Sequence, residues 1–91
     1  MFLTKEYIQN NSSPHPVVEG GRFFILQIGS YTLSIVGGGL GLYGDFENDF
    51  EIAIFNSDGE FENIFLNSSD DIQPYSSIEE INNIIAKIPR I

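Results

Sequence analysis

Two neighbouring stretches in the first half of the chain show the alternation of hydrophobic and polar residues that is typical of a β-hairpin. Residues 22–28 are rich in side chains that favour strands, and in residues 31–36 the apolar side chains recur at every second position from Tyr31. Gly29 and Ser30 leave the two-residue connection that tight hairpins use. The pattern therefore predicts a hairpin whose second strand has an apolar face toward the core and a polar face toward solvent.

A second pair of strands is predicted after a glycine-rich segment. Residues 49–55 place three apolar side chains on the core side of a third strand: Phe50, Ile52 and Ile54. Residues 56–59 are turn formers, and Gly59 can adopt a positive φ. Residues 60–66 are then expected to return as a fourth strand, and residues 67–75 to form a polar loop.

The last element is predicted to be an amphipathic helix over residues 77–88. Ser77 and Glu80 have the spacing of a capping box, and Pro89 ends the helical pattern. Isoleucines recur at helical spacing at positions Ile78, Ile81, Ile84, Ile85 and Ile88. We expect this apolar stripe to lie across one face of the sheet.

The first part of the chain adds one short element. Residues 2–9 favour a short helix with Thr4 as its N-cap, and residues 10–21 are dense in turn-forming residues. Residues 37–44 contain five glycines but no lysine, and they run into acidic residues. We therefore interpret them as a structural loop and not as a phosphate-binding loop.

Together these elements predict a single α+β domain over residues 1–91. A short helix and a loop occupy residues 1–21, and a four-stranded antiparallel sheet of two hairpins occupies residues 22–66. The C-terminal helix of residues 77–88 packs on one face of this sheet. A chain of 91 residues can bury roughly 60–65% of its unfolded surface, which is enough for one modest core. The order of the strands is left open.

The composition excludes several kinds of site. The chain has no cysteine, so disulfides and metal sites built on thiolates are excluded. Its single histidine, His15, stands between two prolines without local partners, and we interpret it as a solvated loop residue. The sequence offers no nucleophile paired with a general base, so we do not expect an enzyme. We also expect no cofactor. The chain shows no secretory signal and no apolar run long enough to span a membrane, which predicts a cytoplasmic protein.

The positions of the charged residues are unusual. The net charge is −9, and no lysine or arginine occurs from Phe23 through Ala86, a stretch that contains eleven carboxylates. Most soluble surfaces mix both signs of charge, which limits self-repulsion. An acidic surface of this kind argues against direct binding to nucleic acid or to acidic lipid, because both are polyanions.

The acidic residues suggest a partner-binding surface. If residues 45–51 were extended, their four carboxylates would lie on one face about 6.8 Å apart. Three further carboxylates beyond the turn would enlarge this row into a patch. The predicted partner-binding residues are Asp45, Glu47, Asp49, Glu51, Asp58, Glu60 and Glu62. The alternative is a solvated strand face that only keeps the protein in solution. The spacing of a calcium-binding EF-hand loop is not met, so no metal site is expected.

Residues 31–88 resemble a group of small, mostly uncharacterised bacteriophage proteins. The matching segments are Ser34–Val36, Gly41–Tyr43, Phe50–Phe55, Asp58–Gly59, Asp70–Tyr75 and the predicted C-terminal helix. The chain departs from that pattern by an insertion at residues 46–49 and by Gln73 and Pro74, where glycine is usual. The resemblance implies a phage accessory protein that acts in the cytoplasm of the host cell, and it implies no catalytic residues.

Two hypotheses of function follow from these observations. The first is a phage-encoded inhibitor that binds a basic, nucleic-acid-handling host defence protein, such as a CRISPR effector or a restriction enzyme, partly by imitating nucleic-acid charge. The second is a structural or assembly module that self-associates, or docks, through apolar sheet edges near Phe46 and Phe61. The sequence leaves the oligomeric state and the identity of the partner open.

Overall fold

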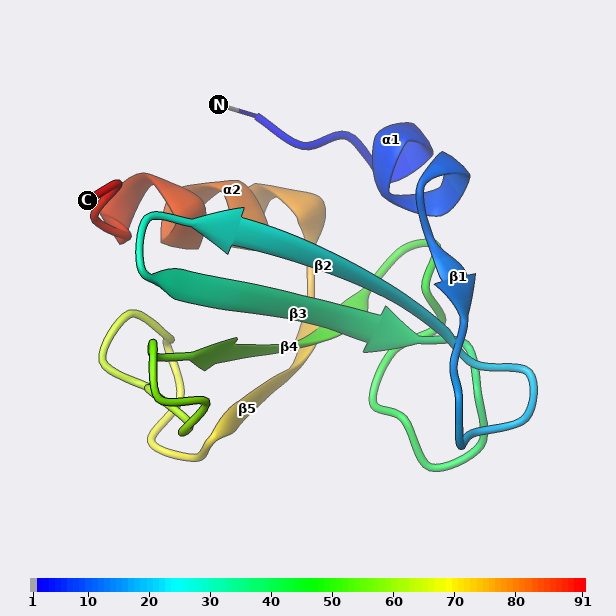
Figure 1. Cartoon of the computed structure of the whole chain (residues 1–91). Coiled ribbons are helices and arrows are strands. Elements are labelled where there is room, and N and C mark those ends of the chain that lie inside the picture. The colour runs from blue at the N-terminus through cyan, green and yellow to red at the C-terminus, as the bar shows by residue number, and fades with distance from the viewer. Residues whose placement is uncertain (1) are drawn as a thin grey trace.

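A computed structural model describes residues 2–91 as one antiparallel sheet with two helices (Figure 1). The elements are α1 (Lys5–Asn10), β1 (Ser13–Pro14), β2 (Arg22–Ile28), β3 (Tyr31–Gly37), β4 (Phe50–Phe55), β5 (Ile72–Ser76) and α2 (Ile78–Lys87). The strands lie in the order β1-β2-β3-β4-β5, so each strand pairs with its neighbour in sequence. The α+β class is thus confirmed, with five strands in a meander where four strands in two hairpins were expected.

The predicted hairpin of β2 and β3 is confirmed. The two strands are paired from Ile28 and Tyr31 at the turn to Arg22 and Gly37 at the far end. Gly29 takes a φ of 57° in the turn, a left-handed conformation that glycine adopts without the steric cost that a side chain would add.

The hydrophobic core lies between α2 and one face of the sheet. Strand β4 directs Phe50, Ile52 and Ile54 into this core, as predicted, and all three are fully buried. Helix α2 contributes the buried residues Ile81, Ile84 and Ile85, and its C-cap residue Ile88 is buried beside them. Fully burying one such side chain stabilises a fold by about 1.5–3 kcal/mol. Burial of the isoleucine stripe therefore holds α2 against this face of the sheet.

Both helices begin at the predicted caps. The Thr4 side chain accepts a hydrogen bond from the Tyr7 amide in α1, and Ser77 and Glu80 form the complete capping box of α2. Leu3, just before α1, exchanges two hydrogen bonds of 2.7 and 2.9 Å with the side chain of Asn82 in α2. Helix α1 therefore shares the core with α2, and in Figure 1 both helices lie along the upper side of the molecule.

The prediction of a fourth strand over residues 60–66 is wrong. That segment makes one isolated bridge, between Phe55 and Phe61, and then turns so that Leu66 enters the core. The strand that pairs with β4 is β5, which lies in the expected polar loop. The core-facing side chains of β5 are polar, Gln73 and Ser76, and they are buried because each has a partner. Gln73 Nε2 donates to Ser76 Oγ at 2.9 Å, and Gln73 Oε1 accepts from the Asn67 amide at 2.6 Å.

The two edges of the sheet also differ from the prediction. Strand β1 has two residues and lies within the segment that was expected to be a loop, where Ser13 pairs with Phe23. At the other edge, β5 has a register shift against β4 between Phe50 and Ile52. Within residues 2–91, no helix has the length and apolar character needed to cross a membrane.

Candidate functional site

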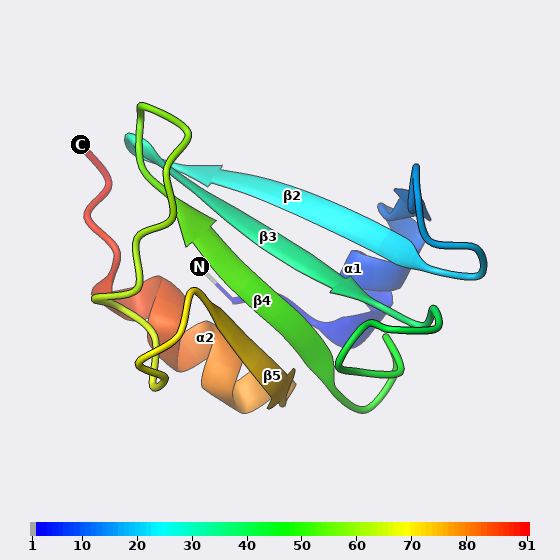
Figure 2. The same cartoon turned by 90° about the horizontal axis from the view of Figure 1, so that it is seen from below.

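The sheet face opposite α2 is not covered by either helix. The register places its side chains in three rows that run across β2, β3 and β4: Phe23, Val36 and Glu51; Ile25, Ser34 and Ala53; Gln27, Thr32 and Phe55. Figure 2 shows these three strands side by side from below. We call these nine residues the open face.

The open face is mostly apolar or neutral. Glu51 is its one charged residue, and the Ile25 side chain is 49% exposed. Phe61, also 49% exposed, stacks on Phe55 with ring centroids 4.7 Å apart and extends the apolar surface past the end of β4. A shallow cavity of about 470 Å³ lies beside Phe55, between Thr32 and Gly59. The exposed Ile25 and Phe61 thus add apolar surface on either side of partly covered neighbours, and exposed apolar surface of this kind is typical of sites that meet another protein.

Charge is divided unequally between the two layers of the molecule. The helical segments, residues 2–12 and 77–91, carry three carboxylates and three basic side chains, which cancel. The sheet segment, residues 13–76, carries ten carboxylates and one basic side chain, Arg22, so the whole net charge of −9 lies there. Arg22 donates from Nε and Nη2 to Ser12, at 3.1 and 2.9 Å. The carboxylates of the sheet segment are therefore largely without basic neighbours in their own layer.

The expected row of four carboxylates is not formed, because residues 45–49 are folded and not extended. Oδ1 of Asp45 accepts hydrogen bonds from the amides of Glu47, Asn48 and Asp49, at 2.8, 2.7 and 3.2 Å. In return, Oδ1 of Asp49 accepts from the Asp45 amide at 2.9 Å. These three amides, that of Glu47 first, hold the pKa of the Asp45 carboxyl well below its usual range, because they favour the charged form. We call residues 45–49 the acidic turn.

The acidic turn is built around a buried aromatic residue. Phe46 has a φ of 62° and is 5% exposed, with its ring 5.3 Å from that of Phe50. Phe46 therefore does not contribute to an apolar sheet edge, although the second hypothesis expected it to. The left-handed backbone turns the Phe46 ring into the core, and the amides that follow point at Asp45. Two of the predicted partner-binding carboxylates, Asp45 and Asp49, thus maintain the shape of the chain here.

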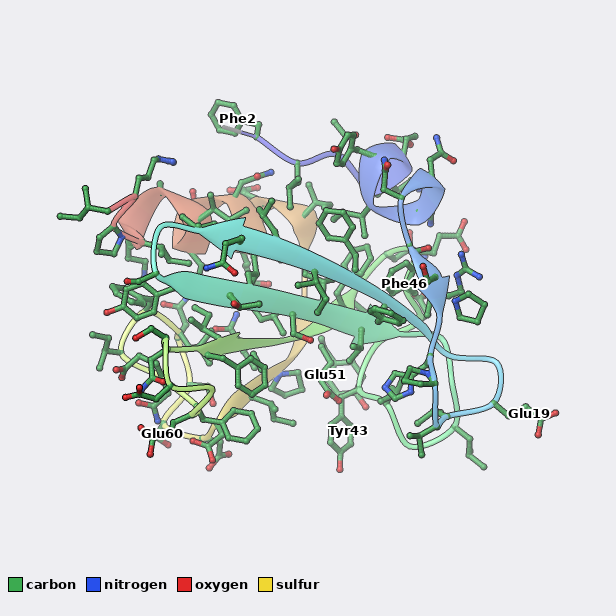
Figure 3. The ribbon with its side chains drawn as sticks, viewed as in Figure 1. Phe2, Glu19, Tyr43, Phe46, Glu51 and Glu60 are labelled. Atoms are coloured by element: carbon green, nitrogen blue, oxygen red, sulfur yellow. The ribbon has the colours of Figure 1, made fainter. Side chains whose placement is uncertain are left out.

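Glu51 is the predicted site residue that does lie on a strand. Its Oε1 accepts a hydrogen bond of 3.0 Å from the amide of Tyr43, in the loop that precedes β4. The carbonyl oxygen of Tyr43 accepts a bond of 3.0 Å from the amide of Tyr75 in β5. Figure 3 shows Tyr43 directed away from the sheet, with Glu51 next to it. Glu51 therefore lies where the open face meets two tyrosines.

The carboxylates after β4 form a second acidic group. The side-chain oxygen of Asn56 accepts from the amides of Asp58 and Glu60, at 2.9 and 3.0 Å, and these bonds shape the turn. Asp58 and Glu60 are exposed, and Glu62 is half-buried. Because β4 lies between this group and the acidic turn, the structure does not gather the seven predicted residues in one row. It places them at both ends of β4, with Glu51 between them.

The remaining polar candidates have structural partners. His15 Nδ1 accepts hydrogen bonds from the amides of Val17 and Val18, at 3.1 and 3.0 Å, and its ring packs edge-on against Phe23. His15 thus holds the β1–β2 loop, where a solvated residue was expected. The part of the chain that the structure describes contains no group of three or more His, Cys, Asp or Glu side chains arranged to hold a metal ion.

Tyr43 and Tyr75 were not among the functional candidates predicted from the sequence. Their rings lie 6.0 Å apart in an edge-on arrangement, and 48% and 62% of their surfaces are exposed. One signal was available: each is an aromatic residue in a segment rich in glycine, proline or acidic residues, where core packing does not require one. Their proximity was hidden because β5 was not predicted.

Comparisons of the chain with protein-family models, with curated proteins and with solved structures found no match. The candidate site therefore rests on its own geometry: an open apolar sheet face, carboxylates at both ends of β4, and an exposed pair of tyrosines.

Proposed function

We propose that the protein binds a basic, nucleic-acid-handling protein through the open face and its acidic surroundings, and thereby blocks access of nucleic acid to that partner. The observation that carries this proposal is the location of the whole net charge of −9 in the sheet segment, with carboxylates before and after β4 and Glu51 on the open face. An apolar centre with a charged rim is the usual anatomy of a protein interface. The negative sign of the rim favours a cationic partner.

Proteins that handle nucleic acid supply this chemistry. They bind phosphates with arginine and lysine side chains, and most of their affinity for nucleic acid is electrostatic. A ligand with uncompensated carboxylates is attracted to such a surface and is steered toward it at low salt. The resemblance to bacteriophage proteins points to a CRISPR effector or a restriction enzyme of the host as the class of partner, and this remains a prediction. In this proposal, the open face blocks nucleic acid by covering the basic surface of the partner. The carboxylates attract that surface, but their spacing does not imitate the regular spacing of phosphates.

The test measures the affinity of purified CRISPR effectors and restriction enzymes for the protein at low and at physiological salt. The double variant Glu60→Gln, Glu62→Gln is compared with the double variant Glu6→Gln, Glu79→Gln, which removes the same charge from the helical segments. We expect binding that weakens with salt, competes with DNA, and is weakened by the first variant alone. An affinity that is indifferent to salt, or equal losses in both variants, would contradict the proposal.

Self-association through the open face is the second candidate, and the exposed Phe61 favours it. The two functions respond to salt in opposite directions. Salt weakens attraction between unlike charges, but it also screens the repulsion between two copies of an acidic face. Sedimentation velocity over a range of protein and salt concentrations separates them, because a monomer that persists at high salt excludes the second function.

A further inference from the structure

We propose that Tyr43, Tyr75 and Glu51 form a binding site for one arginine side chain of the basic partner. This inference rests on the proposed function, because it identifies the chemical group that the acidic protein recognises. We call these three residues the tyrosine site. It lies beside the open face, at the end of β4 that follows the acidic turn.

The two rings of the tyrosine site are available to a ligand. Tyr43 and Tyr75 are 48% and 62% exposed, although their ring centroids lie 6.0 Å apart with an interplanar angle of 62°. Two rings inclined in this way leave their outer faces free, and the face of a phenol ring attracts a cation within about 6 Å of its centroid. Tyrosine is one of the residue types that are enriched where the binding energy of an interface is concentrated.

Backbone hydrogen bonds hold the site in place before any partner binds. The Tyr43 amide donates to Glu51 Oε1 at 3.0 Å, and the Tyr75 amide donates to the Tyr43 carbonyl at 3.0 Å. Both tyrosines are thereby connected to β4 through its Glu51 side chain. A site whose backbone is fixed in advance loses less conformational entropy on binding.

Tyr75 has a backbone conformation that is unfavourable for a residue with a bulky side chain. Its φ is 50°, in the left-handed region, next to the register shift between β4 and β5. A bulky residue seldom adopts this conformation, and glycine or asparagine would adopt it at lower cost. The Tyr75 ring is mostly exposed, so core packing does not explain why tyrosine occupies this position. A role for the Tyr75 ring in binding explains why a tyrosine is found there.

Arginine fits the tyrosine site better than other groups. The guanidinium group is planar, so it stacks on an aromatic ring while its edge donates hydrogen bonds to a carboxylate. Glu51 uses one carboxylate oxygen for the Tyr43 amide, and the second oxygen can accept from the guanidinium. Lysine provides a point charge without the planar edge. An anionic ligand is disfavoured by the carboxylates of the sheet segment.

The first experiment titrates the protein with a hexa-arginine peptide and with a hexa-lysine peptide at low salt, followed by NMR. We expect the ring signals of Tyr43 and Tyr75 to shift more with arginine than with lysine, while the ring signals of Tyr7 remain unchanged. Tyr7 is a matched control because it is an exposed tyrosine of α1, 53% exposed, away from the open face. Equal shifts of all three tyrosines, or none at Tyr43 and Tyr75 when the peptide binds, would overturn the inference.

The second experiment uses variants that keep the charge of the protein. We expect Tyr75→Leu to weaken binding of hexa-arginine by roughly two- to fivefold, the size of an exposed cation–π contact, and Tyr7→Leu to leave it unchanged. Circular dichroism confirms that both variants fold. If Tyr75→Leu has no effect while Glu60→Gln, Glu62→Gln weakens binding, the tyrosine site is wrong and the proposed function stands. If hexa-arginine does not bind at low salt, both are wrong.

Discussion

At the scale of single residues, Asp45 has the largest structural effect of the seven carboxylates that the sequence singled out. Its side chain accepts from three successive amides and so stabilises a turn in which Phe46 has a positive φ. A phenylalanine in the left-handed region carries a steric cost of about 1–2 kcal/mol. Burial of the Phe46 ring offsets this cost, and the carboxylate satisfies the amides that the turn leaves without strand partners.

Replacing Asp45 with asparagine tests this role. The pKa of Asp45 is lowered in the folded protein, so its stabilising effect is present above the ordinary carboxyl pKa and is lost as the pH falls through the folded-state value. We expect Asp45→Asn to lower the melting temperature by a few degrees at pH 7. The difference from the wild-type protein should shrink in strong acid, where the carboxyl group of the wild-type protein also becomes protonated.

The measurement is thermal unfolding followed by circular dichroism, near neutral pH and again in strong acid. Asp58→Asn is the control, because it removes the same charge from an exposed turn. An identical change of melting temperature in both variants at neutral pH would show that Asp45 acts only through net charge.

The acidic turn also shows why the row of carboxylates was predicted and is absent. Alternating acidic and apolar residues at positions 45–51 fit a strand. The same residues fit an aspartate-capped turn equally well, because aspartate readily bonds to amides two or three residues ahead. Burial of Phe46 in the core decides between them, and a contact of that kind is not visible in a local pattern.

At the scale of elements, the β2–β3 turn lies against the C-terminal segment. A Cβ atom placed on Gly29 would lie 2.6 Å from the carbonyl oxygen of Pro89 and 2.8 Å from the amide nitrogen of Ile91. The Ser30 hydroxyl donates to the Ile91 carbonyl at 3.3 Å. Gly29 therefore meets two separate demands, a positive φ and close contact with another part of the backbone.

Alanine substitutions separate these two demands. Gly59, in the turn after β4, also has a positive φ, but a Cβ atom there would have no atom within 4 Å. We expect Gly59→Ala to lower the free energy of unfolding by about 1 kcal/mol, from backbone strain alone. Gly29→Ala should cost more, on the order of 2–4 kcal/mol, because the C-terminal segment must also move. Urea denaturation measures both, and equal losses would contradict the close packing of residues 89–91 on the turn.

The elements that the sequence predicted correctly share one property: a local pattern and a local signal agree. The β2–β3 hairpin has alternation and a two-residue turn, and α2 has a capping box and an isoleucine stripe. Strand β5 has neither, because its core-facing Gln73 and Ser76 are polar and are buried with hydrogen bonds to each other and to the Asn67 amide. Residues 60–66 contain strand-favouring side chains, yet Phe65 leaves the sheet plane to pack edge-on against Tyr31, 5.1 Å away.

At the scale of the whole molecule, the layers differ in charge more than the sequence order suggested. The eleven carboxylates between Phe23 and Ala86 include Glu79 and Glu80, which belong to α2 and balance the basic residues of the helical segments. The remaining nine, together with Glu19, belong to the sheet segment. The sequence therefore showed which residues are acidic, but not how the fold divides them between the two layers. The strands of the open face were predicted, although their order was left open. The tyrosine site depended on β5 as well, and it became visible only in three dimensions.

A protein with its whole net charge in one layer should be destabilised by repulsion within that layer. We expect added sodium chloride to raise the urea midpoint of the wild-type protein, because salt screens the carboxylates of the sheet segment. The double variant Glu60→Gln, Glu62→Gln should begin with a higher midpoint at low salt and gain less from salt. The double variant Glu6→Gln, Glu79→Gln should gain as much as the wild type, because the helical segments have no excess charge to relieve.

The urea midpoint of the same variants, compared with their binding affinity, shows whether the carboxylates lower stability because recognition of a partner requires them. In one outcome, the same carboxylates lower the stability of the fold at low salt and are required for binding to a basic partner. The protein then keeps their mutual repulsion because recognition depends on them. If Glu60→Gln, Glu62→Gln raises the urea midpoint and leaves binding unchanged, the acidic surroundings of the open face serve only to keep the protein in solution. Measuring both quantities on one set of variants decides between these outcomes.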